Sequence, residues 1–256
     1  MIEISLNKVN KTYGFNNVLE DFNLEIKENE IVALIGENGC GKSTILKIIC
    51  GNEYIDSGTV SIRKNQVVGY LSQEIARKDN ILVKDYLYES IKDILIMEEK
   101  LEEYISKMGV LTGNDLESIY KKYSSLQERF INSGGYEIRS KVDKIINGFK
   151  IEYLLNKKFN VLSGGEKRVV CLAAIMIKEP NILLLDEPTN DLDMDTLEWF
   201  EKYLKKYNGT VLIVSHDRYF LDSVVTKTVL IERGKAHIFH GNYTYYIKEN
   251  EERIER

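Results

Sequence analysis

The sequence feature that most constrains the fold is a glycine-rich stretch at residues 36–43, Gly-Glu-Asn-Gly-Cys-Gly-Lys-Ser. It follows a short apolar run, Ile31–Ile35, and precedes an apolar stretch at residues 44–50. A short apolar run that ends at a glycine is typical of a buried strand, and the stretch after the turn has helical character. The segment therefore predicts a buried strand that passes through a tight turn into a helix.

The same eight residues match the pattern G-x-x-x-x-G-K-[ST], and this pattern points to phosphate binding. Its glycines allow backbone N–H groups to wrap a phosphate chain, and the N-terminus of the following helix adds positive potential. We expect Lys42 to reach the β- and γ-phosphates and the Ser43 hydroxyl to take a Mg²⁺ ligand position. A glycine turn with an incidental lysine is the alternative, and the strand–turn–helix context disfavours it.

A second apolar run, residues 182–185, ends in the two acids Asp186 and Glu187. The carboxyl end of a strand is where an α/β sheet exposes its ligand crevice. Asp186 fits the carboxylate that supports Mg²⁺, and Glu187 is placed to orient or deprotonate an attacking water. Acids after a strand are often only turn residues, but beside a phosphate loop the catalytic interpretation is favoured.

Residues 162–166, Leu-Ser-Gly-Gly-Glu, read locally as the start of a helix. Ser163 as N-cap and Glu166 three residues later form a capping box, and capping alone would explain both residues. Further along, strand-like runs near residues 211–214 and 228–231 alternate with helical stretches, which predicts parallel strands with crossover helices.

Taken together and in this order, the phosphate loop, Leu-Ser-Gly-Gly-Glu and Ile-Leu-Leu-Leu-Asp-Glu-Pro-Thr-Asn-Asp-Leu-Asp resemble an ATP-binding-cassette nucleotide-binding domain. The resemblance implies an α/β P-loop NTPase fold with an antiparallel β subdomain and an inserted α-helical hairpin arm. It also implies ATP and Mg²⁺ as cofactors and the hydrolysis of ATP to ADP and phosphate.

The resemblance also implies roles for individual residues. Tyr13 resembles the aromatic residue that stacks on adenine, Gln73 the glutamine that senses Mg²⁺ and the γ-phosphate, and His216 the histidine that contacts the γ-phosphate. The residues around Ser163 resemble the signature that closes on ATP bound to the opposite domain, and residues 190–193 the loop that communicates between the two sites. The implied catalytic residues are Lys42, Gln73, Glu187 and His216; the metal-binding residues are Ser43, Gln73 and Asp186; the ATP-binding residues are Tyr13, Gly36, Asn38, Gly39, Cys40, Gly41, Lys42, Ser43, Thr44, Ser163, Gly164, Gly165 and Glu166.

The middle of the chain has helical periodicity instead of strand alternation. Apolar residues three or four apart predict one helix over residues 87–108, about 35 Å long, and another over 116–130. A short connection should make them an antiparallel hairpin, and a third helix is expected at 138–149. We expect a projecting arm; a helical subdomain folded flat on the core is the alternative. Seven acids and five bases over residues 98–129 indicate a solvated surface.

Within the superfamily the closer resemblance is to the ABC-F group, soluble tandem cassettes that act on ribosomes. It rests on residues 134–149 after the hairpin, on 215–234 and on the charged tail 241–256. Asp191 departs from the histidine more usual at that position. The expected divisions are 1–83 and 151–241 for the two parts of the cassette core, 84–150 for the helical insertion and 242–256 for the start of an interdomain linker.

The implied function is that of an ATP-hydrolysing cassette on the ribosome, in translation or in antibiotic resistance by ribosome protection. Its implied partners are a second ABC domain, in the same full-length chain or in a homodimer, and the ribosome with its rRNA through arm and linker. The isolated domain should hydrolyse ATP weakly. A cytosolic ATPase subunit of a membrane transporter is the main alternative, and a non-catalytic module is disfavoured by Lys42, Asp186 and Glu187.

Composition excludes several other classes of protein. The net charge of −5 argues against nucleic-acid binding through bulk positive charge. The longest purely apolar run, residues 169–177, is too short to cross a bilayer, so no stable membrane insertion is expected. Three scattered cysteines are too few for a disulfide framework or a zinc cluster. These features predict a cytoplasmic protein.

Overall fold

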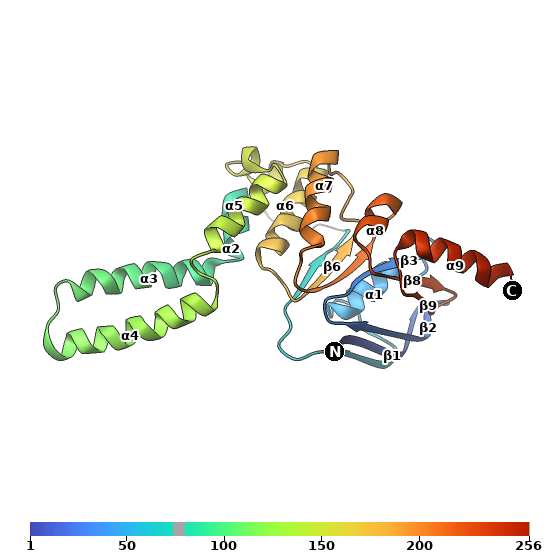
Figure 1. The fold of residues 1–256 in the computed structure, drawn as a ribbon, viewed down its shortest axis with the longest axis horizontal. Coiled ribbons are helices and arrows are strands. Elements are labelled where there is room, and N and C mark those ends of the chain that lie inside the picture. The colour runs from blue at the N-terminus through green and yellow to red at the C-terminus, as the bar shows by residue number, and fades with distance from the viewer. Residues whose placement is uncertain (74–79, 256) are drawn as a thin grey trace. The chain divides into compact units, whose positions relative to one another are not determined.

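The computed structural model describes residues 1–73 and 80–255, and the chain divides into two compact units (Figure 1). Unit 1 combines Met1–Ala76 with Ser163–Arg256, and unit 2 is Arg77–Leu162. Unit 2 thus extends beyond the insertion expected at residues 84–150, by several residues on each side. Residues 74–79, which fall in the expected first part of the core, and Arg256, in the expected linker, lie outside the described residues.

The centre of unit 1 is a six-stranded sheet with the order β5-β6-β7-β3-β8-β9. Its first five strands pair in parallel, and only β9 pairs antiparallel, with β8. Every residue of β3, β6 and β7 is buried, as expected for parallel strands covered on both faces. The α/β prediction is confirmed. The strand bounds are β3 Ile31–Ile35, β5 Val68–Leu71, β6 Ile182–Asp186, β7 Thr210–Val214, β8 Lys227–Glu232 and β9 Lys235–Phe239.

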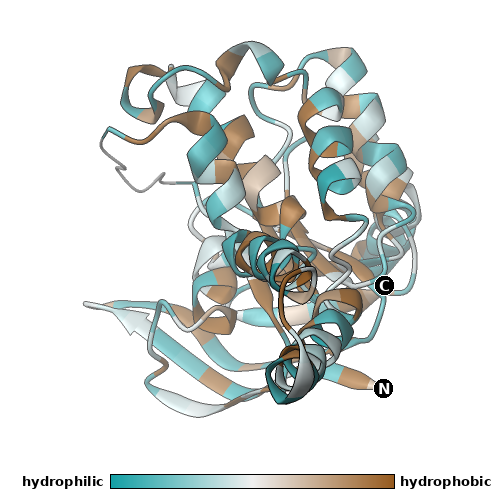
Figure 2. Cartoon of the chain, turned by 90° about the vertical axis from the view of Figure 1, so that its left-hand side faces the viewer, coloured by the Kyte–Doolittle hydropathy of each residue, from teal (hydrophilic) through white to brown (hydrophobic). Residues whose placement is uncertain are grey.

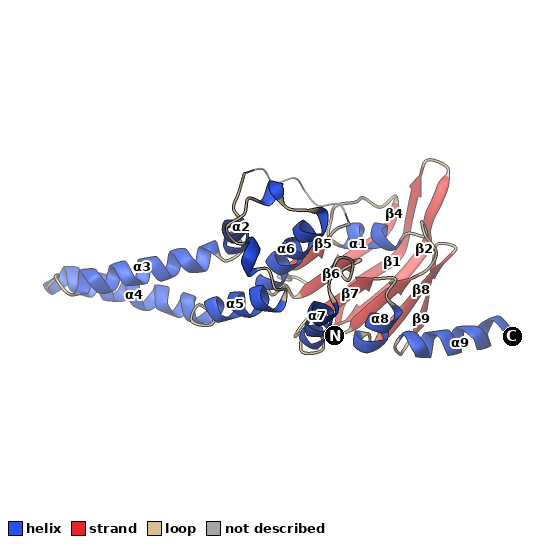
Figure 3. Cartoon of the chain, turned by 90° about the horizontal axis from the view of Figure 1, so that it is seen from above, coloured by secondary structure: helices blue, strands red, loops and turns tan. Residues whose placement is uncertain are grey.

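A second, antiparallel sheet has the order β2-β1-β4, which confirms the predicted β subdomain (Figure 3). Its strands are β1 Ile2–Tyr13, β2 Asn16–Lys27 and β4 Ser57–Ile62. From Phe22 to Ile26 every second residue of β2 is buried and faces the same core as the parallel sheet. The Glu20 N–H donates to the Gly234 carbonyl at 3.1 Å, so a backbone bond joins β2 to the β8–β9 turn.

Several helices of unit 1 begin at a residue whose short polar side chain caps the first turn. Asp193 accepts from the Thr196 N–H at 2.8 Å, and Asp217 accepts from the Phe220 N–H at 3.0 Å. In the described ranges, 1–73 and 80–255, no helix combines the length and the apolar character that a membrane crossing needs. The helices are α1 Lys42–Ile49, α6 Gly164–Ile177, α7 Met194–Leu204, α8 Arg218–Val224 and α9 Tyr243–Glu255.

Unit 2 is helical, and its longest helices form the predicted hairpin. Helices α3 (Lys92–Met108) and α4 (Gly113–Asn132) lie side by side, joined by a short loop (Figure 1). Both show teal and brown residues in Figure 2, as amphipathic helices should. The unit also contains α2 (Val83–Glu89), α5 (Ile138–Gly148) and two 3₁₀ turns, Glu152–Leu154 and Phe159–Val161.

The prediction of one continuous helix over residues 87–108 is wrong. The chain leaves helical geometry at Ile91, where φ is −121°, and this separates α2 from α3. The Ser90 hydroxyl donates to the Leu87 carbonyl, a local bond that competes with helix continuation. The 17 residues of α3 therefore span about 26 Å instead of the expected 35 Å.

The packing of α7 against α8 provides a test of the core. Phe200 and Phe220 are fully buried and stack with ring centroids 5.7 Å apart, whereas the adjacent Tyr219 is 90% exposed. We expect Phe220→Ala to lower the free energy of unfolding by about 3–5 kcal/mol, and Tyr219→Ala to change it by less than about 0.5 kcal/mol. Urea denaturation of both variants measures the difference, and equal losses would contradict the assigned burial.

Candidate functional site

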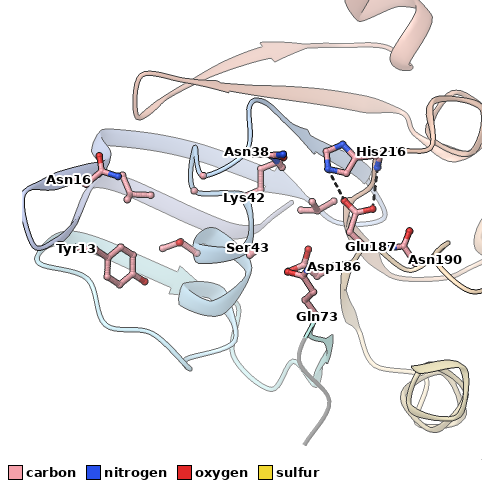
Figure 4. Close-up of a pocket in the computed structure, with 15 residues that line it drawn as sticks. Tyr13, Asn16, Asn38, Lys42, Ser43, Gln73, Asp186, Glu187, Asn190 and His216 are labelled. Carbon is pink, nitrogen blue, oxygen red and sulfur yellow. Dashed lines mark hydrogen bonds and ion pairs between the residues drawn. The ribbon is translucent and has the colours of Figure 1, made fainter. Parts of the chain in front are cut away.

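A cavity of about 630 Å³ opens in unit 1 where the phosphate loop meets the carboxyl ends of β6 and β7. Its size is in the range of small-molecule sites. Figure 4 shows Tyr13 and Asn16 at one end, Glu187, His216 and Asn190 at the other, and Ser43 and Asp186 between. The cavity is lined by Tyr13, Asn16, Val18, Asn38, Gly39, Gly41, Lys42, Ser43, Thr44, Gln73, Asp186, Glu187, Asn190, Val214 and His216.

The phosphate loop is held by close packing that only glycine permits at two positions. Gly36 has a φ of +148°, and a Cβ atom there would lie 2.5 Å from the Ile231 carbonyl oxygen. Gly41 has a φ of +106°, and a Cβ atom there would lie 2.7 Å from Cγ1 of Val18. The loop thus runs tightly between β8 and β2, and its backbone rests against both sheets.

Lys42 begins α1 and is buried at 9% exposure. Its Nζ donates to the carbonyl oxygens of Gly36 and Glu37, both at 2.8 Å. These bonds hold the ammonium over the loop in which a phosphate chain is predicted to lie. An ammonium carries three donors, so it offers a bound anion strong charge-assisted hydrogen bonds.

Asp186 ends β6 at 2% exposure, and its Oδ2 has no hydrogen-bond partner among the described residues. A buried carboxylate oxygen without a partner is costly unless an ion or a ligand completes its environment. Ser43 and Gln73 line the same cavity, so a hydroxyl, an amide and a carboxylate converge there. Oxygen donors of this kind suit Mg²⁺, so the residues present fit the metal that the sequence predicts.

Glu187 is buried at 7% exposure and adopts a left-handed backbone, with φ at +53°. Its N–H donates to the Val214 carbonyl at 2.8 Å, and its Oε2 accepts from the His216 N–H at 3.2 Å. The imidazole Nε2 of His216 lies 3.5 Å from Oε1 (Figure 4). Burial raises the pKa of the Glu187 carboxyl, and the backbone and ring of His216 offset part of this rise.

Some predicted site residues do not line this cavity. Gly36 and Cys40 belong to the loop, but the described lining omits them. The described lining also omits the residues that begin α6, Ser163, Gly164, Gly165 and Glu166. The capping box is confirmed, because the Glu166 N–H donates to Ser163 Oγ at 3.3 Å and the Ser163 N–H to Glu166 Oε2 at 2.8 Å.

Sequence reasoning missed Asn16, Val18 and Val214 as lining residues and gave Asn190 only a communicating role. Asn16 pairs with Tyr13 across the β1–β2 ladder, so recognition of that hairpin would have found it. Val18 and Val214 are apolar strand residues, and their sequence context looks like that of any core position.

Comparisons with known proteins agree with this architecture. The family model described as ABC transporter matches residues 19–190. The chain is 33% identical to ATP-binding protein Uup of Haemophilus influenzae and 36% identical to ABC transporter F family member 5 of Arabidopsis thaliana. It is 30% identical to the energy-dependent translational throttle protein EttA of Mycobacterium tuberculosis. These alignments cover 99%, 98% and 98% of the chain but only 38%, 37% and 44% of the relatives.

Solved structures show the same fold. The ATP binding subunit of an ABC transporter is similar with a TM-score of 0.67 at 20% identity, over 93% of this chain and 90% of that one. A chain in the complex of archaeal ribosomal stalk protein aP1 and recycling factor aABCE1 is similar with a TM-score of 0.65 at 24% identity, over 92% of this chain and 39% of that one.

The burial of Glu187 predicts a pH-dependent gain in stability when its charge is removed. A raised pKa means that the folded chain holds the proton more tightly than the unfolded chain, so ionisation lowers the free energy of unfolding as the pH rises. Glu187→Gln should therefore raise the melting temperature at pH 8. This gain should shrink toward pH 4, below the ordinary glutamate pKa of about 4.3.

Thermal unfolding of the free protein at both pH values measures this effect. Glu117→Gln, which alters an exposed carboxylate of α4, is the matched control and should show no such pH dependence. If Glu187→Gln raised the melting temperature by the same amount at pH 4 and pH 8, the raised pKa of Glu187 would be contradicted.

Proposed function

Because the chain belongs to the ATP-binding-cassette family and, within it, to the ABC-F group, we propose that it is an ATP-hydrolysing cassette of a protein that acts on the ribosome. The single observation that supports hydrolysis best is the cavity that joins Lys42, Asp186 and Glu187 at one edge of the parallel sheet. The chain spans 36–48% of the length of the curated relatives it matches, so the activity of the whole protein is part of this proposal.

In the proposed reaction the nucleotide lies along the cavity, with its base at Tyr13 and its γ-phosphate toward Glu187 and His216. Lys42 and the N-terminus of α1 stabilise the negative charge of the phosphates. Glu187 accepts a proton from the attacking water, and a raised pKa suits a general base. His216 contacts the Glu187 carboxylate through its backbone N–H and its ring, so it holds this general base in place.

Ser43, Gln73 and Asp186 are the residues that would hold Mg²⁺. The unpartnered Oδ2 of Asp186 is the observation that supports this assignment. The bound ion would neutralise phosphate charge. Ser43 and Asp186 would then fix the phosphate chain relative to Glu187, because they extend from α1 and β6, two rigid elements of unit 1.

A second cassette is part of the proposal, because this chain has one phosphate loop and one signature turn. Ser163 and the first turn of α6 present a helix N-terminus outside the described lining of the cavity. They would therefore bind a nucleotide held by another domain, and the cavity described here would receive the signature of that domain. Closure of the two domains would exclude water from both nucleotides.

The ribosomal part of the proposal rests on the helical hairpin of unit 2. Helices α3 and α4 interrupt the cassette between Gln73 and Ser163, where the ABC-F resemblance expects an arm. The relative EttA is by name a translational throttle, and it aligns over 98% of this chain, hairpin included. We propose that ATP binding favours a ribosome-bound state and that hydrolysis favours release, a population shift that the nucleotide controls.

The catalytic assignment predicts a separation of ATP binding from hydrolysis. Glu187→Gln should lower the rate of ATP hydrolysis by about 10²–10⁴-fold, because it removes the general base, and should leave Mg²⁺–ATP binding intact. Phosphate release and equilibrium binding measure the two quantities, with Glu117→Gln as the unaffected control. Retention of the wild-type rate in Glu187→Gln would contradict the assignment.

The need for a second cassette predicts weak hydrolysis by the isolated chain. Its rate per molecule should stay low and independent of protein concentration, which a dilution series of phosphate-release assays measures. A rate per molecule that rises with concentration would instead indicate a productive homodimer.

Ribosome binding is tested with the complete gene product that carries Glu187→Gln and the equivalent change in its second cassette. Without the general base, the ATP-bound state with the two cassettes closed should accumulate. The protein should therefore sediment with ribosomes when ATP is present and remain in the supernatant when ATP is absent. ATP binding without ribosome association would overturn the ribosomal proposal, and co-purification with membranes would favour a transporter subunit.

A further inference from the structure

A buried lysine, Lys11, lies beneath Tyr13, at the end of the cavity where the nucleotide base is proposed to bind. Lys11 is on β1 and is only 7% exposed. Its Nζ contacts Glu53 Oε1 at 2.6 Å and the Tyr54 carbonyl oxygen at 2.7 Å. The same Nζ lies 4.9 Å from the ring centroid of Tyr13. A lysine is seldom buried unless its charge is paired, so this position requires the Glu53 contact.

The segment that contains Glu53 connects α1 to β4 and is fastened to β1 by further bonds. The Thr12 N–H donates to Asp56 Oδ2 at 2.7 Å, and the Asp56 N–H donates to the Asn10 carbonyl at 2.9 Å. Three consecutive residues of β1, Asn10, Lys11 and Thr12, are therefore tied to the segment that follows the phosphate-loop helix. These ties set the position of the Tyr13 ring relative to that helix.

Tyr13 has one covered face and one accessible face. The Lys11 ammonium covers one face of the ring by a cation–π contact, yet the side chain remains 45% exposed and lines the cavity. Burial, followed by the interaction with the Glu53 carboxylate, raises the pKa of the phenol, and the Thr44 side chain and the Lys11 ammonium offset part of this rise. A planar base can then stack only on the face that points into the cavity.

We propose that Lys11 and Glu53 are positioning residues that fix Tyr13 as a one-sided platform for a purine base. This inference deepens the proposed function and rests on it. A purine covers more of the ring than a pyrimidine does, and stacking tolerates different bases because each has a π-face. Asn16 pairs with Tyr13 across the ladder and lines the same end, and its amide has both donors and an acceptor. The site therefore accepts adenine and guanine with similar affinity.

The test compares binding of ATP, GTP, CTP and inorganic tripolyphosphate, each with Mg²⁺, to the 256-residue chain. Lys11→Met should weaken ATP and GTP binding by about three- to tenfold and leave tripolyphosphate binding unchanged, because only the base contact is lost. Glu53→Gln should also weaken ATP and GTP binding, and Lys11→Arg should retain most of the wild-type affinity. Lys64→Met, at an exposed position outside the cavity, is the control and should match the wild type.

The decisive quantity is the ratio of the dissociation constants for ATP and tripolyphosphate, because a general loss of folded structure would weaken the binding of both ligands. An unchanged ratio in Lys11→Met and Glu53→Gln, with the wild type binding ATP, overturns this inference alone. A wild-type preference for CTP over ATP also overturns it. If the wild type binds neither ATP nor tripolyphosphate, the proposed function falls, and this inference falls with it.

Discussion

The close packing of the phosphate loop between the two sheets is the constraint on which the rest of the site depends. At Gly36 and Gly41 the loop backbone approaches Ile231 of β8 and Val18 of β2 so closely that no side chain fits. The antiparallel sheet carries Tyr13, and the parallel sheet carries Asp186, which Glu187 directly follows, so this loop sets the distance between the two ends of the cavity. A shift of the loop would misplace Lys42 and Ser43 relative to both ends.

Burial then sets the chemistry at the carboxyl ends of the strands. Lys42, Asp186 and Glu187 are all buried. Lys42 donates hydrogen bonds to the loop carbonyls, whereas Asp186 Oδ2 has no hydrogen-bond partner among the described residues. In low dielectric surroundings such groups interact strongly with a charged ligand. Glu187 also occupies a left-handed backbone conformation that costs energy for a residue with a side chain, and such strain tends to occur at functional positions. The free site thus gives up stability to keep its charges in place.

Much of the fold follows from local pattern, and the exceptions have physical reasons. The buried runs at β3 and β6 and the capping box at Ser163 were predictable because short-range sequence determines them. The break at Ile91 was not, because the apolar spacing continues through it while the Ser90 hydroxyl competes for the backbone. Strand β9 was also missed, since its burial is only partial and its main support is pairing with β8.

The sequence by itself determined that this chain binds a phosphate group, because glycines, a lysine and a hydroxyl at fixed spacing in one turn have few other uses. It also predicted a metal-binding role for Asp186 and a general-base role for the adjacent Glu187. Only the tertiary structure decided that Lys11 lies under Tyr13, that Asn16 shares its end of the cavity and that Asp186 keeps an oxygen without a partner. These contacts join residues from different strands and loops, so no local pattern records them; they arise when two sheets pack on one core.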